Sequence, residues 1–199
     1  MSQAITLDHH DHQNHADSVD FFGFWLYILT DCILFASLFA AYLVLHQPGA
    51  YGPSLKSFIS LPYVLKETLF LLASNFTFGM AILALYKERT GLIQLFLMMT
   101  FVLGGCFVAM EVHEFIQLAH EGYSWHTSGG ASAFFTLVGT HGFHVSIGLL
   151  WILIMMVQFR CFKVSAMTKR RMTYLGLFWN FLDIVWIFVF TIVYLMGAI

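Results

Sequence analysis

Five apolar stretches, each long enough to cross a lipid bilayer, constrain this chain more than any other feature. A transmembrane helix needs about 20 predominantly apolar residues, and such stretches lie at about 22–45, 64–86, 92–119, 131–159 and 174–196. Only 10% of the 199 residues are charged and the mean hydropathy is +0.78, whereas about a quarter of the residues of a soluble domain are charged. The sequence therefore predicts an all-α integral membrane bundle of five transmembrane helices, with residues 21–199 as one transmembrane domain.

The first 20 residues are polar and rich in His and Asp. They contain Asp8, His9, His10, Asp11, His12, His15, Asp17 and Asp20. A His-rich tract can bind metal, but no fixed ligand geometry follows from this pattern. We interpret residues 1–20 as a mobile, solvated tail and leave metal binding by the tail open.

Lysine and arginine are distributed unequally between the two predicted sides of the membrane. The side of the amino terminus carries Lys87, Arg89, Arg160, Lys163, Lys169, Arg170 and Arg171, and the other side carries Lys56 and Lys66. Basic residues concentrate in cytoplasmic loops. We therefore predict a cytoplasmic amino terminus and an extracytoplasmic carboxyl terminus. The formal net charge of −2 gives no reason to expect a nucleic-acid partner.

Two glutamates near the end of the third stretch are candidates for chemistry. Glu111 and Glu114 are three residues apart and share a helix face, where they could bind a metal or relay protons. A carboxylate di-iron bundle needs Glu-x-x-His motifs, but Gln117 follows Glu114 at that spacing. We therefore predict polar contacts between helices or subunits for both glutamates, and neither a catalytic nor a metal site.

His141 and His144 share a face of the fourth stretch. Haem ligation by two histidines needs a facing His on another helix, and the first, second and fifth stretches contain none within their spans. The nearby Gly139, Gly142 and Gly148 permit close helix approach. We favour a pair that forms polar contacts at a tight interface and keep a di-haem cytochrome b membrane anchor, using His141 or His144 with His113, as the alternative.

Asp31 and Asp183 are single acids within the first and fifth stretches. Charged groups at membrane depth cost at least ~2.5 kcal/mol on insertion scales, so such acids face a partner, a cavity or water. A small transporter that uses both as coupling sites is a further alternative, which predicts substrate flux in liposomes without a partner.

Six segments together carry a resemblance to a known family. They are Gly23-Phe-Trp-Leu-Tyr, Thr30-Asp-Cys-Ile-Leu-Phe, Glu67-Thr-Leu-Phe-Leu-Leu, Met110-Glu-Val-His-Glu-Phe, Val138-Gly-Thr-His-Gly-Phe-His-Val and Phe178-Trp-Asn-Phe-Leu-Asp-Ile-Val-Trp. In this order they resemble subunit III of the haem-copper terminal oxidases, and their residues are most similar to those of the bo-type ubiquinol oxidases of bacteria. The resemblance extends from about Phe22 to the carboxyl end.

The resemblance implies an accessory subunit of a proton-pumping quinol:oxygen oxidoreductase in the bacterial cytoplasmic membrane, without catalytic residues of its own. Its expected partners are a catalytic subunit I that carries the haems and copper, subunit II, a small subunit IV and bound phospholipid. The chain itself is expected to hold no cofactor. Five-helix versions also occur in some cytochrome c oxidases, so subunit III of such an enzyme stays an alternative.

The resemblance also implies roles for individual residues. Asp31 matches the family position of a membrane carboxylate, and we expect it to be lipid-facing or proton-adjacent. The acidic helix and the histidine pair of the family match at Glu111 and Glu114 and at His141 and His144, and Glu67 and Asp183 are expected to join them in polar contacts between helices or subunits. Many relatives have His where this chain has Asn180, and an asparagine cannot titrate.

Overall fold

The computed structural model describes residues 2–45, 61–120, 126, 128–161 and 165–195. The chain divides into two compact units, Met1–Ser37 and Leu38–Ile199. The first unit is the greater part of helix α1 (Ser2–Leu45). The second contains the last turns of α1 and all the later helices, so it holds most of the residues singled out in the sequence.

Helix α1 begins much earlier than the sequence predicted. We expected a mobile tail over residues 1–20 and a helix from about residue 22, but α1 starts at Ser2. Extending an existing helix by one residue is far easier than nucleating a new one, and the segment before Gly23 contains neither proline nor glycine. The apolar span begins only at Val19, so the polar segment lengthens the helix outside the span.

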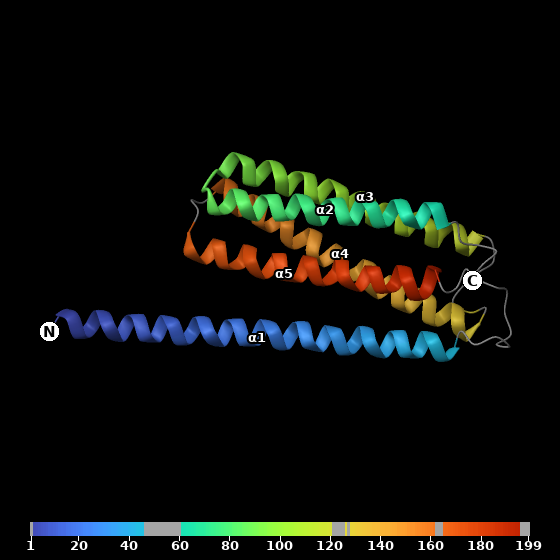
Figure 1. Cartoon of the computed structure of the whole chain (residues 1–199), viewed down its shortest axis with the longest axis horizontal. Helices are drawn as coiled ribbons and strands as arrows, with labels where there is room; N and C mark the ends of the chain where they lie inside the picture. Colours follow the sequence, from blue (N-terminus) through green and yellow to red (C-terminus); the bar gives the residue numbers. More distant parts are fainter. Residues whose placement is uncertain (1, 46–60, 121–125, 127, 162–164, 196–199) are drawn as a thin grey trace. The chain divides into compact units, whose positions relative to one another are not determined.

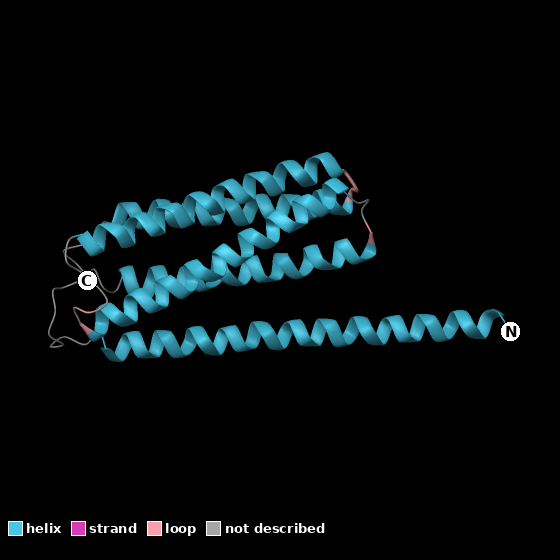
Figure 2. Ribbon diagram, turned by 180° about the vertical axis from the view of Figure 1, so that it is seen from behind, coloured by secondary structure: helices cyan, strands magenta, loops and turns pink. Residues whose placement is uncertain are grey.

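Four helices of the second unit run alongside one another (Figures 1 and 2), and their contacts form a closed ring. These are α2 (Leu61–Tyr86), α3 (Thr90–His120), α4 (Gly129–Cys161) and α5 (Ala166–Val189), which continues as the π-helical segment η2 (Phe190–Leu195). Each helix packs against the next along the chain, and α5 with η2 closes the ring against α2. Together with α1, five helices of the described chain are long and apolar enough to cross a membrane. The all-α membrane bundle is confirmed.

Two helix starts differ from the sequence-based bounds. Helix α5 begins at Ala166 instead of about residue 174, because Ser165 caps it by accepting a 3.2 Å hydrogen bond from the backbone N–H of Thr168. Helix α2 begins at Leu61 instead of about residue 64, and it includes Pro62 in its first turn. Proline is tolerated there because the first N–H groups of a helix have no intrahelical partner.

The short turn between α2 and α3 is tied to the start of α5. Glu88 in this turn adopts the left-handed conformation with φ of 54°, and its carboxylate accepts a 2.8 Å bond from Lys169 Nζ. The hydrogen bond and the charge of Lys169 lower the pKa of Glu88. This ion pair fixes two basic segments at one end of the ring.

Apolar side chains cover much of the outside of the bundle while several polar ones lie inside. Phe76 and Phe143 are 72% and 65% exposed, whereas Glu67 and His141 are 0% exposed. This arrangement is expected for a bundle in lipid, where polar side chains face other helices. Chemistry in this chain must therefore be sought in the interior of the ring.

Small residues allow the helices to approach one another closely around Trp179. A Cβ atom on Gly104 of α3 would lie 3.1 Å from the Trp179 ring, and one on Gly148 of α4 would lie 2.8 Å from it. Glycine at both positions therefore lets α3 and α4 pack against the buried indole of α5.

Candidate functional site: a buried carboxyl cluster and its polar neighbours

Three glutamates meet inside the ring. Glu67 comes from α2, and Glu111 and Glu114 come from one face of α3. Their exposed fractions are 0%, 3% and 8%, and both α3 glutamates interact electrostatically with Glu67. The structure thus brings together the two acids that sequence spacing had paired and a third from a neighbouring helix.

Two tyrosines surround this carboxyl cluster, which we define as Glu67, Glu111 and Glu114. The Tyr194 hydroxyl of η2 donates a 3.0 Å hydrogen bond to Glu114 Oε2. The Tyr63 hydroxyl of α2 donates a 3.2 Å bond to the backbone carbonyl of Met110, and Tyr63 also interacts electrostatically with Glu67 and Glu114. One hydroxyl, that of Tyr194, is therefore hydrogen-bonded to the cluster, and that of Tyr63 is bonded to the backbone beside it.

Helix α4 passes the cluster through Gly142. A Cβ atom at this position would overlap the carboxyl group of Glu111. Glycine therefore lets the α4 backbone reach the acid directly, a closer approach than any side chain would allow.

The carboxyl cluster has few partners for its oxygen atoms. Both carboxyl oxygens of Glu67 and Oε1 of Glu111 are buried without a hydrogen-bond partner among the described residues. None of the lysines and arginines described makes an ion pair with the three glutamates, and Lys66, the nearest in sequence, is exposed. Such a group of acids is costly unless its negative charge is reduced.

His141 lies in the wall of the ring next to this cluster. Its Nε2 is 3.2 Å from the carbonyl oxygen of Leu182, and its ring packs against Phe107 and Trp186 with centroid distances of 5.8 and 5.0 Å. His144 Nδ1 is instead 2.8 Å from the carbonyl oxygen of Thr140 in its own helix. His141 thus links α4 to α5, and its Nε2 is already engaged by a carbonyl rather than open to an iron.

No group of three or more His, Cys, Asp or Glu residues within the described part of the chain is arranged to hold a metal ion. His113, the other histidine of the di-haem alternative, is exposed on α3 and packs against Tyr63 at a centroid distance of 6.3 Å. The structure therefore gives the di-haem alternative no enclosed pair of facing histidines.

A second polar group lies deeper in the ring, between α2, α3 and α5. Asn75 Nδ2 donates a 3.0 Å bond to Asp183 Oδ2, and Trp179 Nε1 donates a 3.2 Å bond to Ser74 Oγ. Ser74 in turn donates to the carbonyl of Thr100 at 3.4 Å. Asp183 therefore accepts a hydrogen bond from an amide of α2. A coupling acid of a transporter would instead face an open pathway.

Asp31 belongs to the first unit and stays within α1. The hydroxyl of Tyr27, one turn earlier on the same helix, is hydrogen-bonded to its carboxyl group. Asp31 thus belongs to the first unit, whereas all three residues of the carboxyl cluster belong to the second.

Several polar partners were not predicted from the sequence, because they are tyrosines and tryptophans whose aromatic rings are typical of core residues. Tyr63, Tyr194 and Trp186 were not singled out, yet Trp186 Nε1 donates a 3.1 Å bond to Thr68 Oγ1. A usable signal exists, since buried tyrosine and tryptophan generally need a hydrogen-bond partner.

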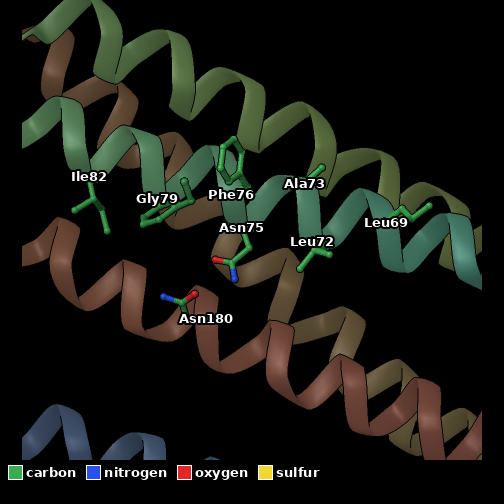
Figure 3. Close-up of a pocket in the computed structure, with 9 residues that line it drawn as sticks. Leu69, Leu72, Ala73, Asn75, Phe76, Gly79, Ile82 and Asn180 are labelled. Atoms are coloured by element: carbon green, nitrogen blue, oxygen red, sulfur yellow. The ribbon is translucent and has the colours of Figure 1, made fainter.

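A groove of about 590 Å³ lies between α2 and α5. Figure 3 shows that its two amides, Asn75 and Asn180, extend toward each other across the groove from opposite helices. The remaining wall is mostly apolar and includes Leu72, Gly79 and Ile82. Asn180, the asparagine that cannot titrate, thus lies on this groove and not on the carboxyl cluster.

The chain is similar to known proteins along almost its full length. A family model described as cytochrome c oxidase subunit III matches residues 3–198. The chain is 52% identical over 200 residues to cytochrome bo(3) ubiquinol oxidase subunit 3 of Pseudomonas aeruginosa, covering 100% of this chain and 96% of that protein. It is 40% identical to the protein of the same name from Buchnera aphidicola subsp. Baizongia pistaciae, covering 92% and 94%. Cytochrome c oxidase subunit 3 of Bacillus sp. (strain PS3) is 42% identical, with 90% and 86% covered.

Proposed function

Because the chain belongs to the cytochrome c oxidase subunit III family, we propose that it is the accessory subunit III of a haem-copper quinol oxidase in the aerobic respiratory chain. The observation that carries this proposal is the 52% identity over the whole chain to a subunit 3 of a bo(3) ubiquinol oxidase. The resemblance inferred from the six sequence segments is confirmed. The chain is a multi-pass membrane protein of a multi-subunit oxidase complex.

The choice of quinol as electron donor rests on the relatives. Proteins named as subunit 3 of ubiquinol oxidases include those at 52% and 51% identity, whereas the cytochrome c oxidase relative is at 42%. We therefore propose quinol rather than cytochrome c. Oxygen consumption by the purified complex with ubiquinol and with reduced cytochrome c discriminates, and a preference for cytochrome c would overturn the quinol assignment.

In this complex the expected partners are a catalytic subunit I, a subunit II and a small subunit IV. The haems and copper belong to the catalytic partner, and this chain supports that partner from the side. The exposed apolar outer surface of the ring is compatible with both lipid and neighbouring transmembrane helices. Inside the chain, Glu67, Glu111, Glu114, His141, His144 and Asp183 serve as polar contacts that stabilise the bundle.

Affinity purification of the tagged chain from its native membrane tests the assignment. We expect a larger haem-containing subunit to co-purify, and deletion of the chain to leave haem content while shortening the active life of the oxidase during turnover. A chain that purifies alone as a stable monomer would contradict this. A stoichiometric haem spectrum of the isolated chain would favour the di-haem anchor, and substrate flux in liposomes without an oxidase would favour the transporter.

Bound phospholipid is the second expected ligand, and the groove between α2 and α5 is our candidate for an acyl chain. Its apolar wall and volume suit a hydrocarbon chain. A Cβ at Gly79 meets nothing within 4 Å, so Gly79→Leu would fill the groove without an internal clash. We expect less lipid to co-purify with Gly79→Leu, measured by mass spectrometry. Gly105→Leu is the matched control because its Cβ is equally free but lies outside the groove.

The proposed topology has the amino terminus in the cytoplasm and the carboxyl terminus outside. The ion pair between Glu88 and Lys169 supports this, because it joins two basic segments at one end of the ring, as the positive-inside rule favours. The test uses a variant in which Cys32, Cys106 and Cys161, all exposed and free, are replaced by serine. A new cysteine at the carboxyl end should then react with a membrane-impermeant reagent in intact cells, and labelling only after lysis would reverse the topology.

A further inference from the structure

The carboxyl cluster has a defined depth in the bundle. Glu67 lies six residues after the start of α2, and Glu114 lies six residues before the end of α3, which corresponds to about 9 Å of helix in each case. The cluster is thus inside the predicted span, well away from the basic turn at the other end of the ring. Because the chain itself buries all three acids, bulk water screens their neighbouring negative charges little.

The usual ways of compensating such charges do not account for this cluster. None of the described lysines and arginines makes an ion pair with the three glutamates. The described residues also contain no group of three or more His, Cys, Asp or Glu that is arranged to hold a metal ion. Because Glu67 is fully enclosed by its own chain and Glu111 is 3% exposed, a side chain of a neighbouring subunit cannot reach them without opening the ring. Among the described residues no side chain is left to compensate these charges, which points to a small species such as a proton.

Hydrogen bonds satisfy only some of the carboxyl oxygens of the cluster. Tyr194 donates to Glu114, but both oxygens of the fully buried Glu67 have no partner among the described residues. Glu67 interacts with both α3 glutamates, so its bare oxygens belong to the cluster. In the described part of the chain, the other titratable groups facing it are Tyr63 and Tyr194, with His113 behind Tyr63. A neutral hydroxyl can donate a hydrogen bond but removes no negative charge.

We propose that Glu67, Glu111 and Glu114 form one shared proton-binding site that holds at least two protons at neutral pH. Each bound proton removes a charge and supplies an O–H donor, which an unpartnered carboxyl oxygen of a neighbouring acid can accept. The bound protons therefore lower the negative charge that the acids of α2 and α3 impose on one another. The site is thus a store of exchangeable protons inside a subunit whose proposed function is accessory. Under that proposed function, the same three residues form only polar contacts.

Infrared spectroscopy of the intact complex tests this inference, because carboxylic acids and carboxylates absorb at different frequencies. The informative variant carries Glu67→Gln, Glu111→Gln and Glu114→Gln together, and Gln keeps the shape of each side chain. We expect it to lose the protonated-carboxyl absorption of at least two groups at pH 7 relative to the wild type. Glu88→Gln, at an exposed acid, is the control and should lose none.

A loss smaller than two groups overturns the proposal. If the triple variant fails to assemble, the double variant Glu67→Gln with Glu111→Gln replaces it. A site with at least two protons must then lose at least one, since the single remaining acid can hold only one, and a smaller loss again overturns the proposal. The readout counts protonated carboxyl groups of this chain and does not depend on the electron donor. Co-purification of the wild-type chain with a haem-containing subunit tests the subunit III assignment separately, so the two failures are distinguishable.

Discussion

The Tyr194 hydroxyl donates a 3.0 Å hydrogen bond to Glu114, and it does so from the π-helical segment that ends the described part of the chain. A π-helical turn rotates the following side chains relative to an uninterrupted α-helix, and such turns are frequent at functional sites. Here it accompanies an aromatic residue, 1% exposed, whose hydroxyl reaches an acid of α3. The bond ties the end of the last helix to the carboxyl cluster.

Replacing Tyr194 by phenylalanine removes this donor while keeping the ring. We expect the free energy of unfolding to fall by about 1 kcal/mol, because a hydrogen bond inside a membrane protein contributes roughly that much. Unfolding of the detergent-solubilised protein by a denaturing detergent measures it. Tyr86→Phe is the matched control, since Tyr86 is exposed, and equal stability of the two variants would contradict the role of Tyr194.

Gly142→Ala tests the close approach of α4 to Glu111. The added methyl group would overlap the carboxyl group, and overpacking of this kind costs about 1–3 kcal/mol. The same measurement should find Gly105→Ala neutral or slightly stabilising, because its Cβ meets nothing within 4 Å and alanine favours helix. If Gly142→Ala is as stable as Gly105→Ala, the carboxyl group of Glu111 does not lie against α4.

The sequence predicted the elements of this fold far better than the partners inside it. Five spans followed from apolar length alone, since the bilayer sets that length. The pairing of Glu111 with Glu114 followed from helical periodicity, but the approach of Glu67 could not, because it depends on how α2 and α3 are rotated against each other. The helical state of residues 2–20 was missed for another reason, since composition does not report propagation from an adjacent helix.

Asp183 should tolerate asparagine but not leucine. Asparagine keeps a side-chain oxygen that can accept the 3.0 Å bond from Asn75 Nδ2, whereas leucine leaves this half-buried amide without its acceptor. An unsatisfied donor costs about 1–3 kcal/mol when it is fully buried and less when it is partly exposed. We therefore expect Asp183→Asn to resemble the wild type in unfolding experiments and Asp183→Leu to be clearly less stable. Equal losses in both variants would show that the charge, and not the hydrogen bond, matters at this position.

The ion pair between Glu88 and Lys169 predicts a dependence on pH and salt. Lys169 lowers the pKa of Glu88, so the stabilisation is fully present above the ordinary glutamate pKa and is lost as the pH falls through the lowered value. Glu88→Gln should thus be slightly less stable than the wild type at pH 7 and equally stable in strong acid. Because the two side chains are 68% and 39% exposed, 1 M salt should also remove the difference. Glutamine keeps the cost of the left-handed backbone at this position, so a difference that persists in both acid and salt would mean that something other than the ion pair stabilises this turn.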